Sequence, residues 1–85
     1  MSIPKITKQN ILAALKYIDE NGVPSANARS KYELISDEGK SYPPKYVVAV
    51  ADYLANGGEK PSTKNFISRE ARRFLVKEGF QIISR

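Results

Sequence analysis

The longest apolar run of the chain lies near its middle, between Pro43-Pro44 and Asn56-Gly57-Gly58. Within it, Val47, Val50, Ala51 and Leu54 have the spacing i, i+3, i+4 and i+7, which is typical of one helix face. Other alanines and valines make the rest of the run mostly apolar, which is typical of a buried helix. Pro44 suits the first helical position, and the glycines tolerate a left-handed C-terminal turn. The pattern predicts a buried central helix beginning at Pro44 and ending at Asn56-Gly57-Gly58.

Two more helices are predicted on either side of this run. The first has Thr7 as its N-cap, covers residues 8–20 and ends at Asn21-Gly22. Its inward face has the same helical spacing and consists of Ile11, Ala14, Leu15 and Ile18. The last helix covers residues 69–78, is capped by Ser68 and stops at Gly79.

The remaining segments favour short strands and loops. Residues 31–36 alternate and place Tyr32 and Leu34 on one face of a strand, and a turn at 37–40 leads to a short return strand at Ser41-Tyr42. Residues 80–84 predict a closing strand, paired with residues 31–36. Residues 23–30 and 59–65 read as loops, and Phe66 and Ile67 are expected to tuck back onto the core.

These elements predict a single α+β domain over residues 1–85, in which three helices pack on a short two- to three-stranded sheet. Their order along the chain is helix, strand, strand, helix, helix, strand.

The composition of the chain excludes several classes of function. The chain contains neither Cys nor His, which excludes zinc fingers, Cys–His nucleophiles, Ser–His–Asp triads and iron–sulfur ligation. Fourteen Lys and Arg against nine Asp and Glu give a net charge of +5, which favours a polyanionic partner. No apolar run is long enough for a bilayer, and the first residues lack the apolar core of a secretory signal. We therefore expect a cytoplasmic protein with no membrane partner.

Both of the later helices begin in a way that disfavours helix stability. The central helix has no Ser, Thr, Asp or Asn in the two positions before Pro44, and Lys45 adds a positive charge at the positive end of the helix dipole. Arg69 likewise adds a positive charge in the first turn of the last helix, where the helix dipole disfavours a cation. Free N–H groups and a cation suit a bound anion such as a phosphate.

The last helix carries a cationic face. Helical geometry places Arg69, Arg72 and Arg73 together, with Lys77 at the edge of this face and Ala71, Phe74 and Leu75 on the opposite side. A charged outer face is often only a solvated surface. The planar fork of Arg nevertheless suits phosphates and guanine edges.

Tyrosines bracket the corner before the central helix. Tyr42 and Tyr46 flank Pro43-Pro44-Lys45, and their rings could either stack on a base or pack against the prolines. With these rings included, the sequence predicts one nucleic-acid-binding surface made of Lys40, Tyr42, Lys45, Tyr46, Arg69, Arg72, Arg73 and Lys77. No catalytic residue, metal or cofactor is predicted.

A metal-dependent nuclease is a weaker alternative. Glu38-Gly39-Lys40 has the Glu-x-Lys spacing of such enzymes, and Asp19 or Glu20 could supply the earlier carboxylate for magnesium. Those sites need carboxylates on a rigid sheet, whereas this triplet falls in a predicted surface turn.

The chain resembles the small N-terminal head domain of certain modification-dependent restriction endonucleases of the HNH type, over residues 6–83. The matching positions are Tyr32, Leu34, Gly39, Tyr42, Pro43, Pro44, Lys45, Val47, Ala51, Gly57, Phe66, Leu75, Gly79, Phe80 and Ile82. Where many relatives show Phe-Ser-Gly-Gly, this chain has Phe66-Ile67-Ser68-Arg69, so an Arg-bearing helix start replaces a glycine pair. In that family the head precedes modules that recognise modified DNA and cut it. The resemblance implies a non-catalytic, DNA-engaging role.

Together these features predict a non-catalytic nucleic-acid-binding module, the duplex-DNA targeting domain of a bacterial restriction or defence protein. Its expected partners are DNA and further domains or subunits of the same system. The alternative is a protein-interaction or assembly domain within such a system, which would use the tyrosine-rich side of the central helix. Whether a modified base is sensed stays open at this point.

Overall fold

Helices and strands follow one another in the predicted order. The computed structural model describes residues 5–24, 31–58, 60–61 and 68–84. Its elements are α1 (Lys8–Asn21), β1 (Tyr32–Ile35), β2 (Ser41–Tyr42), α3 (Pro44–Asn56), α4 (Ser68–Lys77) and β3 (Gln81–Ser84). The α+β class is therefore confirmed, with three helices and a three-stranded sheet in the part of the chain that is described.

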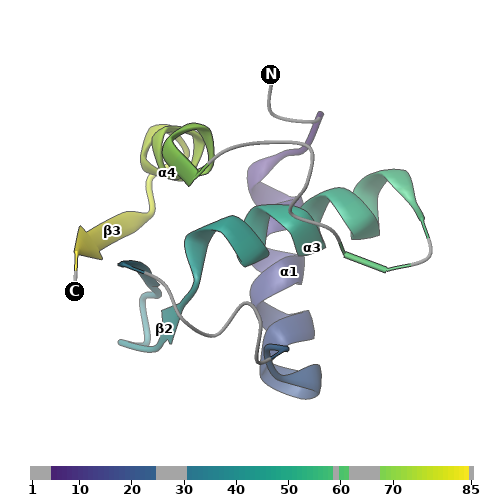
Figure 1. Ribbon diagram of the computed structural model, residues 1–85, viewed down its shortest axis with the longest axis horizontal. Coiled ribbons are helices and arrows are strands. Elements are labelled where there is room, and N and C mark those ends of the chain that lie inside the picture. Colours follow the sequence, from purple (N-terminus) through teal and green to yellow (C-terminus); the bar gives the residue numbers. More distant parts are fainter. Residues whose placement is uncertain (1–4, 25–30, 59, 62–67, 85) are drawn as a thin grey trace.

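Helices α1 and α3 cross each other and form the centre of the core (Figure 1). The four predicted inward residues of α1 are all buried, and α3 is buried from Tyr46 to Ala51. Leu54, expected on the same inward face, is 42% exposed, so that expectation is wrong. The last turn of α3 is contacted through Tyr53, whose ring meets Tyr17 of α1, and through Asn56, whose Nδ2 donates to the Lys5 carbonyl at 3.2 Å, so Leu54 is left on the solvent side.

The two helices of the core begin differently. At α1, Thr7 Oγ1 accepts the N–H of Asn10 at 3.3 Å, while the N–H of Thr7 donates to Asn10 Oδ1 at 2.8 Å. This reciprocal pair is a capping box, and it confirms Thr7 as the N-cap. At α3, Pro43 occupies the N-cap position and makes no side-chain cap, as predicted. The N–H of Val47 already donates to the Pro43 carbonyl at 3.0 Å, so the uncapped groups lie before it.

The sheet is antiparallel, with strand order β2-β1-β3. Leu34 stands opposite Tyr42 on one side and Ile82 on the other, so these three side chains share the face that is turned to the helices. Between β1 and β2, Gly39 has a φ of 82°, and the N–H of Ser36 donates to the Lys40 carbonyl at 2.9 Å. The predicted hairpin and the pairing of the closing strand with β1 are confirmed.

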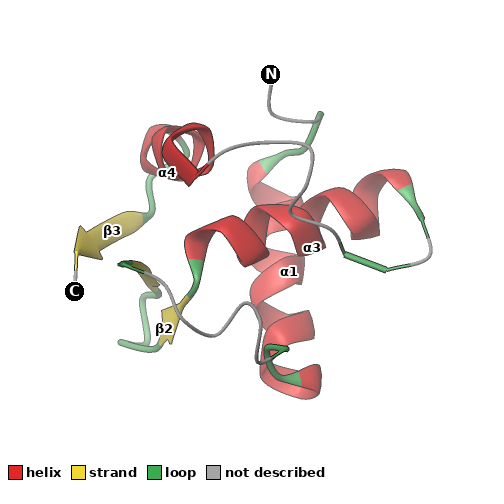
Figure 2. Ribbon diagram, viewed as in Figure 1, coloured by secondary structure: helices red, strands yellow, loops and turns green. Residues whose placement is uncertain are grey.

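A tight connection joins α4 to β3 (Figure 2). The N–H of Phe80 donates to the Leu75 carbonyl and that of Gly79 to the Val76 carbonyl, each at 3.0 Å. Gly79 has a φ of 95°, which completes the pattern of a Schellman motif. The motif turns the chain directly from the helix into the edge strand, so α4 and β3 lie next to each other.

Helix α4 confirms the predicted last helix but has different ends. Helix α4 begins at Ser68 itself, so Ser68 belongs to the helix instead of preceding it, and the helix ends at Lys77, one residue early. Phe66 and Ile67, expected on the core, lie outside the described residues, as does most of the predicted loop at 23–30. Within the described part of the chain, none of the helices is long and apolar enough to cross a membrane.

Candidate nucleic-acid interface

A surface cleft of about 610 Å³ lies where α4 meets the β3 edge of the sheet. It is lined by Tyr32 from β1, by Arg72, Arg73, Val76 and Lys77 from α4, and by Ile82, Ile83 and Ser84 from β3. The lining thus contains three cations and no carboxylate among the residues that the structure describes. We call it the α4–β3 cleft.

The amphipathic pattern of α4 produces this arrangement. Ala71 and Leu75 are fully buried against the core, as the sequence predicts, and they fix which side of the helix faces inward. Arg69, Arg73 and Lys77 are exposed on the other side. The Schellman turn then places β3 beside the helix, so Ile82, Ile83 and Ser84 of this strand form the other wall of the cleft.

Arg72 is held differently from the other two cations of the cleft. Its guanidinium carbon lies 3.7 Å from the centroid of the Tyr32 ring, a cation–π contact. The side chain is half-buried, and its Nε is buried without a hydrogen-bond partner among the described residues. The expectation that Arg72 faces solvent is therefore wrong in part. The cause is β1, whose first residue offers an aromatic face directly beside α4.

Two exposed apolar side chains share the cleft with the cations. Val76 is 56% exposed and Ile83 is 38% exposed. Val76, Ile83 and Tyr32 are not among the binding residues that the sequence predicts. The sequence does indicate an exposed apolar residue on the closing strand. Ile82 and Ile83 are both apolar, and successive residues of a strand point to opposite faces, so one of them faces away from the core.

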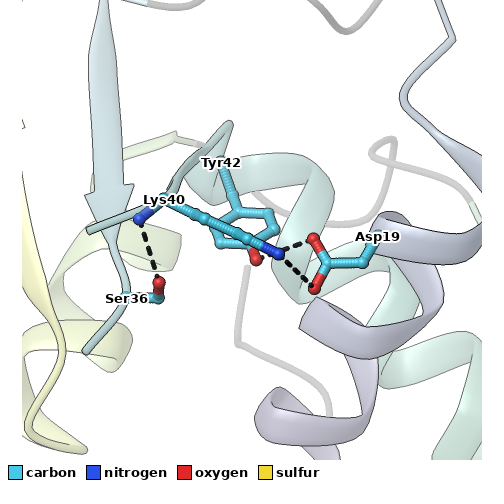
Figure 3. Close-up of polar contacts among 4 residues, drawn as sticks. All are labelled: Asp19, Ser36, Lys40 and Tyr42. Atoms are coloured by element: carbon cyan, nitrogen blue, oxygen red, sulfur yellow. Dashed lines mark hydrogen bonds and ion pairs between the residues drawn. The ribbon is translucent and has the colours of Figure 1, made fainter. Parts of the chain in front are cut away.

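Tyr42 belongs to the core and not to a binding surface. It is only 5% exposed, and its hydroxyl donates to an Asp19 carboxylate oxygen at 2.8 Å (Figure 3). Burial, followed by the hydrogen bond and negative charge of Asp19, raises the pKa of Tyr42 to about 12. Tyr46 is 6% exposed, and burial also raises its pKa. Of the two alternatives for these rings, their burial in the core favours packing over stacking on a base.

Lys40 is likewise turned away from the α4–β3 cleft. Its ammonium lies 3.7 Å from Asp19 on α1, and its backbone N–H donates to Ser36 Oγ at 3.2 Å (Figure 3). Both ends of this ion pair are exposed, so it contributes little to stability. Because β1 separates β2 from β3, Lys40 and Tyr42 lie at one edge of the sheet and the cleft lies at the other.

The remaining predicted residues, Lys45 and Arg69, do not line the cleft. Lys45 is half-buried in the first turn of α3, and Arg69 is exposed in the first turn of α4. Of the eight residues that the sequence predicts, the structure brings together Arg72, Arg73 and Lys77.

Three carboxylates gather elsewhere on the molecule, while Glu70 shares a small depression on α4 with Arg73 and Lys77. Asp19, Asp37 and Glu38 line a smaller depression of about 300 Å³ between α1 and the β1–β2 turn. Asp19 is already bound to Tyr42 and Lys40, and Glu38-Gly39-Lys40 lies in an exposed turn, as predicted. Among the described residues, no group of three or more His, Cys, Asp or Glu is placed to hold a metal ion.

These features define a small α+β domain with a basic, partly apolar cleft beside its edge strand. The profile of the family described as "ScoMcrA-like, N-terminal head domain" matches residues 4–84, and the chain belongs to this family. The match confirms the resemblance to head domains of modification-dependent restriction enzymes. No curated protein and no solved structure matches the chain.

Proposed function

We propose that this chain is a non-catalytic DNA-binding head domain of a bacterial restriction system, which acts in the cytoplasm and engages duplex DNA through the α4–β3 cleft. The observation that carries the proposal is the lining of this cleft, where three cations occur without a carboxylate. The family supports a place in a restriction protein, beside other domains.

The cations of the cleft suit a sugar-phosphate backbone. Arg73 and Lys77 are exposed and one helical turn apart, so both can reach neighbouring phosphates on one strand. Arg69 lies one turn before Arg73 and extends the same row. Lys45, at the uncapped start of α3, is a further candidate for a phosphate contact.

Matched double variants test this proposal. Arg73→Ala with Lys77→Ala removes two exposed cations from the cleft, and Lys5→Ala with Lys16→Ala removes two exposed cations elsewhere. If the cleft holds two phosphates, the first variant should bind a short duplex roughly tenfold more weakly and lower the log–log salt slope by about 2. The control should stay near the parent protein in both quantities. Equal effects of the two variants would show that only net charge matters, and no binding by the parent would refute the proposal.

The alternative function, a protein-interaction domain that uses the tyrosine-rich side of α3, has less support. On the tyrosine-rich side of α3, Tyr46 is buried, and the ring of Tyr53 contacts Tyr17 edge to face at 6.1 Å. A protein partner would also give a shallower dependence of affinity on salt than DNA does. The same salt titration therefore separates the two functions.

A further inference from the structure

We propose that the α4–β3 cleft receives one nucleotide displaced from the base stack, so that a duplex containing an unpaired nucleotide binds more tightly than a fully paired one. This inference rests on the proposed DNA-binding function and specifies the form of DNA that the cleft prefers.

The first argument is the stack formed by Arg72 and Tyr32. The guanidinium lies flat enough on the ring to approach its centroid at 3.7 Å, and both residues line the cleft. Aromatic rings and Arg guanidinium planes are the groups on which proteins stack unpaired bases. Because the contact with Tyr32 and partial burial restrict Arg72, the platform exists before any ligand arrives. Little side-chain freedom is lost when a base stacks on it.

The second argument is the exposed apolar surface in the same cleft. Val76 leaves more than half of its side chain in water, next to cations that would suffice for phosphate binding alone. Ile83 points to the other face of β3 from Ile82 and extends the exposed apolar surface around the edge of the sheet. A paired duplex keeps the faces of its bases stacked inside the helix, so it offers these two residues little apolar surface. A displaced base presents its face and can cover them.

The third argument concerns size and charge. A cleft of about 610 Å³ falls within the range of about 300–1,000 Å³ that small-ligand sites occupy, so one nucleotide fits. Arg73 and Lys77 are exposed and lie on the same helix as Arg72. They can hold the phosphates on either side of a base that enters between Arg72 and Ile83.

Three duplexes of one sequence test the inference: fully paired, with a single unpaired thymidine, and with an abasic site in place of that thymidine. Fluorescence anisotropy on the whole chain should show that the thymidine bulge binds at least about fivefold more tightly than the paired duplex, since the displaced base stacks on the platform. The abasic bulge has the kink and phosphates of the thymidine bulge but no base to stack. It should therefore bind within about twofold of the paired duplex.

Each other outcome has a definite meaning. Equal affinity for all three duplexes overturns the inference and leaves the proposed function standing. If the thymidine and abasic bulges increase the affinity equally, the inference is also overturned, because the domain would then recognise the flexibility of the DNA and not the displaced base. Absence of binding to any duplex refutes the proposed function itself.

A pair of matched variants locates the effect. Val76→Thr with Ile83→Thr keeps both side chains β-branched but makes the cleft more polar, whereas Leu12→Thr with Leu54→Thr changes two exposed leucines elsewhere. The first variant should lose most of the preference for the thymidine bulge and keep its affinity for paired duplex. The control should retain the preference. If both variants keep it, the base binds outside this cleft and the inference fails.

Discussion

At the scale of single residues, Arg72 makes a structural contact and also lies in the proposed binding cleft. Its contact with the Tyr32 ring joins α4 to the start of β1, and its side chain also lines the cleft. A cation–π contact at a partly exposed site stabilises a fold by about 0.5–1 kcal/mol. Arg73 is exposed and makes no such contact in the described structure. The two adjacent arginines should therefore respond differently to substitution.

Arg72→Ala should lower the free energy of unfolding by about 1 kcal/mol, whereas Arg73→Ala should change it by less than about 0.5 kcal/mol. Both should weaken DNA binding. Urea unfolding monitored by circular dichroism measures the stability difference, and Arg72→Lys serves as a control that keeps the charge but loses the planar stack. Equal stability of the two alanine variants would show that the Tyr32 contact contributes nothing.

Tyr42 should make stability depend on alkaline pH. Its pKa is about 12 in the folded protein, above the ordinary 10.0, so the stability it contributes is complete below pH 10 and is lost as the pH rises towards 12. Tyr42→Phe removes the hydrogen bond to Asp19 and should cost about 1–2 kcal/mol at neutral pH. The difference between parent and variant in urea unfolding should shrink between pH 10 and 12. A constant difference across that range would contradict the assignment.

At the scale of elements, the α4–β3 connection decides whether the cleft exists. The Schellman turn at Gly79 sets the direction of β3 and therefore the distance of Ile83 from the cationic side of α4. A Cβ at Gly79 would meet no tight contact, with the nearest atom, Lys8 Nζ, 3.9 Å away. The cost of substitution is therefore conformational and arises from its positive φ.

Gly79→Ala should destabilise the domain by about 1 kcal/mol or more, while Gly79→Asn should cost less, because Asn tolerates the left-handed conformation better. Thermal unfolding of both variants measures this difference. A loss in the alanine variant no greater than in the asparagine variant would show that the turn carries no backbone strain.

The elements themselves follow from local sequence, and the cleft does not. Helix caps, apolar spacing and glycine stops depend on residues within a few positions of each other, so α1, α3 and the hairpin are predictable from the chain alone. The burial of Tyr42, the exposure of Leu54 and the Arg72–Tyr32 contact depend on which element packs beside which. These arrangements are set by tertiary packing, which periodicity does not specify.

At the scale of the whole molecule, the two depressions differ in charge. Asp19, Asp37 and Glu38 line the depression by the β1–β2 turn together with Lys16, whereas the α4–β3 cleft is lined by three cations and no carboxylate among the described residues. Under the proposed function, a polyanion would be attracted to the cleft, and this attraction would orient the domain before contact. The net charge of +5 alone would not orient it.

The central claim is that the α4–β3 cleft is the surface that contacts DNA, and NMR mapping of backbone amides during titration with a short duplex tests it most directly. We expect the largest chemical-shift changes within residues 72–77 and 81–84, at the start of β1 and, more weakly, at Arg69. Amides of the acidic β1–β2 turn should change little. The largest changes at that turn, or along the exposed side of α1 with the cleft unaffected, would contradict the account.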